Sequence, residues 1–504
     1  MSRKAFVLLA ALIAMPAVAE LRYDIGSPTV RDVYVDPVAG NDSNSGDSRN
    51  AALRTLTEAW NRIPSGRPLT GNGYRIQLLA GRYDESALPN YLESRYGTAQ
   101  FPIIIQSADA PRSARLAGDL NIFDSRYIYL IGLDMVPEPA GDVLHCELCD
   151  HILVRDSNLN GGNRIAHDMV KINQTQYVYL EDSTFSGAED NTIDFVAVQY
   201  GHVARNKISN AQDWCMYTKG GSAYLRIEQN EFFDCGTGGF TAGQGTGFQF
   251  MTPPWIHYEA YDIKVINNVV HDTEGAGLGV NGGYNILMAY NTLYRVGTRD
   301  HMLEVVFGNR SCDGVPGDEG RGRCQQYLDL GGWGTTVVDD GTNSVRIPDR
   351  NVFIYDNILY NPPGVVSPQA FTIAAPFGSA LSDTNLQIKG NVIFGAESLG
   401  IGDDSGCSPT NPTCNEGQLR AENTFVAPQL GSDLRPLAAT GTLYTPPNFS
   451  WSDAPSPPLA PAGDPSNSVT VDRNGVVRGS ANAAGAYVIA GATQKAPRRR
   501  TARH

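Results

Sequence analysis

Acidic and basic side chains recur in three neighbouring stretches of the sequence, and their types could support proton abstraction beside a bound cation. The stretches are AHDMVKI, DNTID and YTKGG, and the residues of interest in them are Asp168, Lys171, Asp190, Asn191, Asp194 and Lys219. Carboxylate and amide oxygens are ligands that Ca²⁺ accepts. A lysine whose pKa is lowered by burial or by a neighbouring positive charge can act as a general base. This chemistry requires a fold that brings the three stretches together.

A repeated phrase in the sequence predicts such a fold. Alternating apolar residues are followed by Asn or a small residue in ILVRDSNL at 152, VYLEDSTF at 178 and IKVINNVV at 263. The strong copies place this marker residue at Ser157, Ser183, Asn206, Asn230, Asn268, Asn291, Asn357 and Asn391, and weaker copies place it at Gly81, Ala108 and Leu133. Alternation of period two inside a repeat of about two dozen residues predicts a solenoid of strands. Each asparagine marker would turn inward at a corner and satisfy backbone groups there.

We therefore expect an all-β fold: a single-stranded right-handed parallel β-helix with an N-terminal capping helix and long loop insertions. Residues 1–19 have the basic start, short apolar run and small-residue cleavage site of a signal peptide. Residues 20–66 would form a strand and the capping helix, and residues 67–400 the β-helix, with insertions at about 241–262 and 299–350. Residues 401–495 would pack on the helix as a loop and tail region, and residues 496–504 would form a disordered basic tail.

Counting back from each marker aligns the charged residues of successive coils. Lys171, Asp194 and Thr218 each lie twelve residues before the next marker. Because neighbouring parallel strands are about 4.8 Å apart, five charged residues should lie within about 10 Å of one another: Asp168, Lys171, Asp190, Asp194 and Lys219. The same count turns Lys219 inward by parity, although the following Gly220 and Gly221 end the strand and could release its side chain to either face.

A structural explanation competes with a functional one at this patch. Polar residues are normal on the outside of a solenoid, and Lys171 opposite Asp194 could be an ordinary ion pair. Carboxylates stacked on adjacent coils repel one another unless a cation lies between them, which favours a site. The candidate substrate-binding residues are Lys171, Trp214, Trp255 and His301; for Trp255 and His301, loop packing and a simple surface position are the alternatives.

Composition limits the partners of the chain. The net charge of −14 argues against nucleic acid, and no segment after the signal peptide is long and apolar enough for membrane insertion. We expect a secreted or periplasmic monomer. Eight cysteines suit an oxidising compartment, with Cys312/Cys324 and Cys407/Cys414 as plausible disulfides. The lone C-x-x-C of Cys146 and Cys149 has no second pair, so it does not predict a metal site.

The three stretches resemble the β-helix polysaccharide lyases of family 9, the pectate lyase type. Asp168 matches the first aspartate of that family, DNTID matches its D-D-G-W-D phrase, and Lys219 matches its lysine before Gly-Gly. The resemblance implies that Asp168, Asp190, Asn191 and Asp194 bind Ca²⁺ and that Lys219 is the base. Asn191 and Ile193 depart from the family phrase, and an alternative register pairs residues 213–219 with it, at the loss of two acids.

The reaction implied by these residues is β-elimination in an acidic, uronate-containing polysaccharide. The base removes the proton at C5, which lies α to the uronate carboxylate, and the 4-linked sugar is expelled. A cation that neutralises this carboxylate would stabilise the enolate that develops. A glycoside hydrolase or epimerase on the same scaffold, and a non-catalytic glycan-binding or surface protein, remain the alternatives.

Overall fold

The structure, a computed structural model, covers most of the chain that follows the predicted signal peptide. It describes residues 21–138, 142–162, 168–311, 322, 325–327, 329, 337–338, 344–374, 384–401, 416–451 and 460–491. The predicted signal peptide, the basic tail and the predicted cysteine pairs Cys312/Cys324 and Cys407/Cys414 lie outside these residues.

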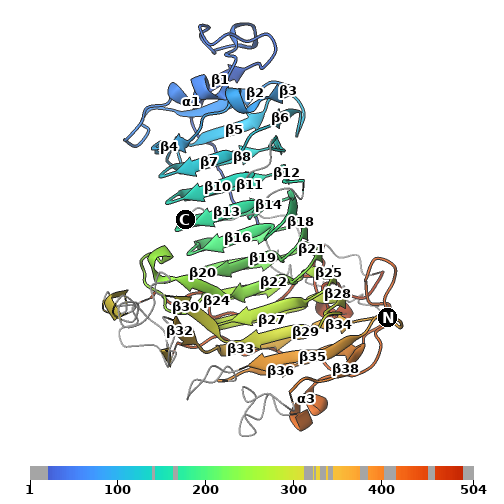
Figure 1. The fold of residues 1–504 in the computed structure, drawn as a ribbon. Helices are drawn as coiled ribbons and strands as arrows, with labels where there is room; N and C mark the ends of the chain where they lie inside the picture. The colour runs from blue at the N-terminus through green and yellow to red at the C-terminus, as the bar shows by residue number, and fades with distance from the viewer. Residues whose placement is uncertain are drawn as a thin grey trace, which may run out of the picture.

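The chain winds into coils whose strands form three long parallel sheets (Figure 1). The first sheet contains β1 (Val30–Val35), β2 (Gly73–Leu78), β5 (Ile103–Ser107), β8 (Arg126–Ile131), β11 (Asp150–Arg155), β14 (Gln176–Glu181), β17 (Gln199–Ala204), β20 (Ser222–Glu228), β24 (Ala260–Ile266), β27 (Gly283–Ala289), β33 (Arg350–Tyr355) and β36 (Gln387–Lys389). The second sheet contains β4 (Leu92–Glu93), β7 (Leu120–Phe123), β10 (Leu144–Glu147), β13 (Val170–Asn173), β16 (Ile193–Val196), β19 (Trp214–Lys219), β22 (Gly238–Gly243), β26 (Ala276–Asn281), β29 (His301–Val306), β35 (Ser367–Ala374) and β38 (Ala396–Ser398). The third sheet contains β3 (Gly81–Tyr83), β6 (Ala114–Leu116), β9 (Asp134–Met135), β12 (Asn158–Asn160), β15 (Thr184–Ala188), β18 (Lys207–Ala211), β21 (Glu231–Cys235), β25 (Val269–Thr273), β28 (Thr292–Val296), β34 (Ile358–Tyr360) and β37 (Val392–Phe394).

These sheets confirm the predicted all-β parallel β-helix. Their inward side chains form one continuous apolar core that runs the length of the coils. A smaller sheet joins the two insertions: β23 (Gly245–Gly247), β30 (Gly308–Ser311), β31 (Val337–Val338) and β32 (Ser344–Ile347). In it β23 and β30 pair in parallel, whereas β32 pairs antiparallel with β30 and β31.

The predicted serine and asparagine markers line one corner of the coils and satisfy backbone groups there. The side-chain Oδ1 of Asn230 accepts from Asn206 N at 3.0 Å, and that of Asn268 accepts from Asn230 N at 2.9 Å. Each amide also donates back to a carbonyl, as Asn268 Nδ2 does to Ile227 O at 2.8 Å. The ladder extends one coil beyond the predicted markers to Asn423, whose Oδ1 accepts from Asn391 N at 3.0 Å. Buried backbone groups that the turn would leave unpaired are thereby satisfied.

Short helices lie at the two ends of the solenoid. Within residues 20–66, where the sequence predicts a strand and a capping helix, α1 spans Leu56–Asn61, and Thr55 Oγ1 accepts from Glu58 N at 3.0 Å as its N-cap. Leu56, Ala59 and Trp60 join the core cluster, and α1 lies beside β1 (Figure 1). Further helical segments include α3 (Glu416–Glu422), η1 (Arg49–Ala51), η2 (Glu85–Ala87), η3 (Phe248–Phe250) and η4 (Gly479–Ala481).

Two disulfides lie in the described coils, Cys146–Cys149 and Cys215–Cys235. The C-x-x-C pair is thus a disulfide-bonded pair at the end of β10. Among the described residues, no helix has both the length and the apolar character needed to cross a membrane.

Candidate active site

The charged residues of the sequence analysis meet on the outer face of the second sheet. Strand pairing places Lys171 opposite Asp194, and Asp194 opposite Tyr217, on β13, β16 and β19. The expected alignment of Thr218 with Asp194 is therefore wrong by one residue. Thr218 pairs with the core residue Phe195 and is fully buried.

The register error has a local cause that also reorients Lys219. Asp194 pairs with Tyr217, and Gln199 pairs with Ala223. Gln199 comes five positions after Asp194, but Ala223 comes six positions after Tyr217. The extra residue lies in the turn of Gly220 and Gly221, whose φ angles of +69° and +83° favour glycine. Because Lys219 is two residues after Tyr217, both side chains leave the strand on the same outer face. The inward orientation expected from parity is thus corrected.

Asp168, Asp190, Asn191, Asp194 and Lys171 form one contiguous polar group, here called the acidic cluster. Lys171 Nζ donates to Asp168 Oδ2 at 2.9 Å and lies 3.2 Å from Asp194 Oδ2. Asn191 Nδ2 donates to Asp168 Oδ1 at 2.7 Å and to Asp190 Oδ1 at 2.9 Å. Stacking of coils thus brings together every acid that the sequence analysis selected, as predicted.

Burial in the acidic cluster is deeper than an outward-facing patch would suggest. Asp194, expected to point into solvent, is fully buried between its column neighbours, and neither of its oxygens accepts a hydrogen bond of good geometry from the described residues. Burial raises the pKa of Asp194 to about 7, against the lowering effect of Lys219 and Lys171. Near neutral pH this carboxyl is therefore partly protonated, which relieves repulsion within the cluster.

Two other members of the acidic cluster, Asp168 and Lys171, keep their charges near neutral pH. Burial alone would raise the pKa of Asp168, but the charge of Lys171 and hydrogen bonds hold it below the usual value. Burial would lower the pKa of Lys171, but the carboxylates of Asp194 and Asp168 raise it above the usual lysine range. Burial, together with the charges of Asp168 and Asp213, raises the pKa of Asp190. Lys171 is thus a persistent cation that cannot serve as a base.

Tyr217 links the acidic cluster to Lys219. Its hydroxyl accepts from Lys219 Nζ at 3.0 Å and from Asn191 Nδ2 at 3.1 Å, and the amine lies 4.2 Å from the centre of the Tyr217 ring. Gln244 Oε1 also accepts from Lys219 Nζ, at 3.4 Å. Tyr217 was not predicted as a site residue because the stretch WCMYT has the alternation of a core strand. Its place two residues before Lys219 was a usable signal.

A buried ion pair behind Lys219 holds the turn that follows it. Glu259 Oε2 accepts from Gly220 N at 2.8 Å and from Thr246 Oγ1 at 2.9 Å. Glu259 Oε1 lies 2.8 Å from Arg310 Nη1, and both side chains have no exposed surface. Since Glu259 and Arg310 come from the two insertions, these loops fix the end of β19, a coupling that the sequence does not reveal.

The other predicted substrate-binding residues have packing or ion-pair contacts of their own. Trp214 is only 4 % exposed and packs with Tyr217 and Ala276. Trp255 packs against Phe248 and Met251 in the first insertion. His301 Nε2 contacts Glu304 Oε2 at 3.0 Å. The strand of His301, β29, is separated from β19, which carries Lys219, by β26 and β22. Glu304 shares the column of Lys171 and Asp194, three coils beyond Tyr217.

Ca²⁺ does not fit the acidic cluster as it is arranged here. A Ca²⁺ site needs six to eight oxygen ligands around one point. Here the ammonium of Lys171 lies between Asp168 and Asp194, and Asn191 directs its N–H groups toward the carboxylates. Among the described residues, no group of three or more His, Cys, Asp or Glu side chains has a metal-binding arrangement.

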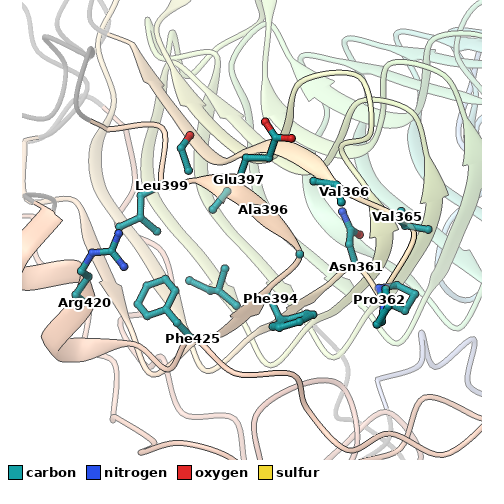
Figure 2. Close-up of a pocket in the computed structure, with 15 residues that line it drawn as sticks. Asn361, Pro362, Val365, Val366, Phe394, Ala396, Glu397, Leu399, Arg420 and Phe425 are labelled. Atoms are coloured by element: carbon teal, nitrogen blue, oxygen red, sulfur yellow. The ribbon is translucent and has the colours of Figure 1, made fainter.

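A cavity at the C-terminal end of the solenoid offers little comparable chemistry (Figure 2). Its volume is about 490 Å³, and its lining is mainly apolar, with Pro362, Val365 and Phe425 among the residues that Figure 2 labels. Glu397 and Arg420 are its charged groups, and Arg420 donates to Glu416 at 2.8 Å. The acidic cluster with Tyr217 and Lys219 is therefore the better candidate for an active site.

Comparisons with known proteins agree with the fold. A family model described as "Right handed beta helix region" matches residues 142–308. A search of curated proteins gives no match. The chain is similar to pectate lyase Pel9A at 15% identity, with 77% of this chain and 83% of that chain covered and a TM-score of 0.38. It is similar to the A-module of the Azotobacter vinelandii mannuronan C-5 epimerase AlgE6 at 12% identity, with coverages of 71% and 92% and a TM-score of 0.44.

A further similar structure is the GH136 lacto-N-biosidase of Eubacterium ramulus, at 10% identity, with 79% of this chain and 67% of that chain covered and a TM-score of 0.36. These proteins have different activities. At these identities the likeness concerns the fold alone and does not decide between reactions.

Proposed function

We propose that the protein is a polysaccharide lyase that cleaves an acidic, uronate-containing polysaccharide by β-elimination, with Lys219 as the base. The observation that carries this proposal is the contrast between two lysines on one outer face. Lys171 is paired with two carboxylates, whereas the hydrogen-bond partners of Lys219 are the uncharged oxygens of Tyr217 and Gln244. One lysine is thus a fixed cation, and the other is an amine that no carboxylate of the described residues contacts directly.

The two lysines match the two demands of the reaction. Proton removal at C5 needs a base, and the carboxylate beside C5 needs a positive neighbour while the enolate develops. The unprotonated amine of Lys219 takes the C5 proton, the electron pair forms the C4–C5 double bond, and the bond from C4 to the glycosidic oxygen breaks. The departing oxygen takes a proton from water. Lys171 supplies positive charge next to this position.

Tyr217 and the Gly220–Gly221 turn orient the amine. The hydroxyl of Tyr217 accepts from Lys219 Nζ at 3.0 Å, and Glu259 holds the amide of Gly220 at 2.8 Å. Such fixed hydrogen bonds keep a base in place for proton transfer and lower the reorganisation that the reaction requires. Because only an unprotonated amine accepts a proton, activity should increase toward alkaline pH.

Incubation with a panel of uronate polymers tests the proposal. A lyase produces an unsaturated sugar whose double bond, conjugated to the carboxylate, absorbs in the ultraviolet. New reducing ends without this absorbance would indicate a glycoside hydrolase, and inversion at C5 without cleavage would indicate an epimerase. Binding to a polymer without any reaction would indicate a non-catalytic protein, and each of these results contradicts the lyase.

The variant Lys219→Ala tests the base. We expect kcat to decrease by about 10³-fold, within the range of general base catalysis, with polymer binding retained. Lys207→Ala is a matched control because the Lys207 side chain on β18 is 63% exposed and pairs only with Glu231 among the described residues. The base assignment fails if Lys219→Ala keeps wild-type turnover.

A further inference from the structure

The space between two carboxylates of the acidic cluster is occupied by an ammonium group of the chain itself. Lys171 Nζ lies 2.9 Å from Asp168 Oδ2 and 3.2 Å from Asp194 Oδ2. The Lys171 side chain is 35% exposed, whereas those of Asp168 and Asp194 are 6% and 1% exposed. The ammonium therefore covers the carboxylates from the solvent side.

This position of Lys171 follows from strand pairing and not from a chance rotamer alone. Lys171 and Asp194 are directly opposite each other on β13 and β16. Directly opposed side chains of neighbouring strands are within reach of one another, and opposite charges there attract. Asp168 precedes Lys171 by three residues and is reached by the same amine.

Asn191 adds hydrogen-bond donors to the acidic cluster. Its Oδ1 accepts from Trp214 N at 3.0 Å, and a backbone N–H can only donate, so this contact fixes the orientation of the amide. The amide nitrogen therefore faces Asp168, Asp190 and the Tyr217 hydroxyl. Oxygen atoms would face a metal ion here, but the cluster presents N–H groups instead.

We propose that Lys171 is the resident cation of the acidic cluster and that the site functions without a divalent metal ion. The ammonium lies against Asp168 and Asp194 in the resting protein and provides the positive charge beside the substrate carboxylate. The second of these roles rests on the proposed lyase function, whereas the first concerns the folded chain alone. The proposal differs from the Ca²⁺ site that the sequence resemblance implied.

Calcium binding tests the proposal without any substrate. We expect isothermal titration of the wild-type protein with CaCl₂ to show no heat of binding at this site and the melting temperature to be unchanged by Ca²⁺ or by a chelator. Lys171→Ala removes the ammonium and leaves Asp168, Asp190 and Asp194 around the freed space. This variant should gain a weak Ca²⁺ site, with Kd on the order of 10⁻⁴–10⁻³ M, and a melting temperature that increases with Ca²⁺.

Two further variants keep the test decisive. Lys171→Arg retains a cation and should not bind Ca²⁺, and Lys171→Gln, which removes the charge with less loss of volume, replaces the alanine variant if that protein does not fold. Adding Asp168→Asn to the calcium-binding variant should abolish the new site. The proposal is overturned if wild-type protein binds Ca²⁺ and Asp168→Asn loses that binding, or if neither neutral variant gains it.

Activity separates this inference from the proposed function. If the wild type is a lyase, a chelator should leave its rate unchanged, and a chelator-induced loss restored by Ca²⁺ would contradict the resident cation. If no uronate polymer is cleaved, the lyase proposal fails, but the calcium titration still decides whether Lys171 closes the acidic cluster.

Discussion

The outer faces of the first and second sheets each carry a column of side chains stacked from coil to coil, and the two columns are stabilised in different ways. On the first sheet, the residues that form an aromatic ladder are Tyr127, His151, Tyr177, Tyr200 and Tyr224, with ring centroids 4.1–5.1 Å apart and interplanar angles of 10–20°. On the second sheet, the column contains Lys171, Asp194 and Tyr217. Strand spacing brings like positions together in both columns.

The difference is one of self-complementarity. Aromatic rings stack on their own kind, so each ring of the ladder is satisfied by its neighbours, and this offsets the strain of backbone φ angles between +53° and +65° at all five positions. Charged groups of one sign repel when stacked, so the second column alternates lysine, acid and tyrosine. Among the described residues, buried Asp194 has the Lys171 ammonium at 3.2 Å as its ion-pair partner but accepts no hydrogen bond of good geometry. The second column, whose charged groups need partners of a different kind, is therefore the better candidate for a functional site.

Among the variants that compare the two columns, removal of one hydroxyl from the second column should have the largest effect, and this effect is on kcat. In Tyr217→Phe, Lys219 and Asn191 both lose an acceptor. Hydrogen bonds to charged groups contribute about 1.5–3 kcal/mol, which corresponds to a decrease in kcat of about 10- to 100-fold. The measurement is the initial rate of unsaturated-product formation. Tyr200→Phe removes a hydroxyl from the aromatic ladder and should leave the rate unchanged; equal effects of the two variants would remove the functional distinction.

Removing one ring from the first column should affect stability but not activity. Tyr200 lies 5.1 Å from Tyr177 and 4.5 Å from Tyr224, so Tyr200→Ala loses two stacked pairs. At about 0.5–1.5 kcal/mol for each pair, the free energy of unfolding should decrease by about 1–3 kcal/mol. Denaturant unfolding gives this value, and Tyr200→Phe, which keeps the ring, should remain near wild type. An unchanged stability in the alanine variant would show that the stacking is incidental.

The fold could be predicted from sequence because each coil repeats the same residue types, an apolar alternation followed by an asparagine or a small residue. Asn230 and Asn268 each follow an apolar alternation, and the backbone of a tight corner needs their amides. Asn423 was missed because the helix α3, and not a strand, precedes it. Periodicity thus gives the coils but fails where another element replaces a strand.

The candidate site could be predicted only in part. Stacking of coils was enough to bring Asp168, Asn191 and Asp194 together. It was not enough to place Lys219, because a constant coil length cannot anticipate the extra residue at Gly220–Gly221. Nor does a list of acids and lysines show which side chain fills the space between them, since that depends on the rotamer of Lys171 and the orientation of the Asn191 amide.

The smallest predicted effect is on the pH dependence of the free energy of unfolding. It distinguishes the buried Asp194 from acids on the surface. The folded protein raises the pKa of Asp194 to about 7, above the ordinary value of 3.8, so the native state holds a proton that the unfolded chain releases. The free energy of unfolding should therefore decrease as pH increases from about 4 to 7, and the contribution of this proton is lost above that range. Asn cannot titrate, so Asp194→Asn should lose less stability than wild type between about pH 5 and pH 8.

Calorimetric melting temperatures at the two pH values test this difference. We expect the wild-type protein to lose about 1–3 °C more than Asp194→Asn over the interval. The pKa values of Asp262 and Asp356 are also raised to about 7 by burial, but both proteins contain these residues, so their effects cancel in the comparison. Asp84→Asn, at a side chain that is 66% exposed, should behave as wild type. Parallel pH profiles for Asp194→Asn and wild type would mean that Asp194 holds no extra proton in the folded state, and the second column would then differ from the aromatic ladder in composition but not in protonation.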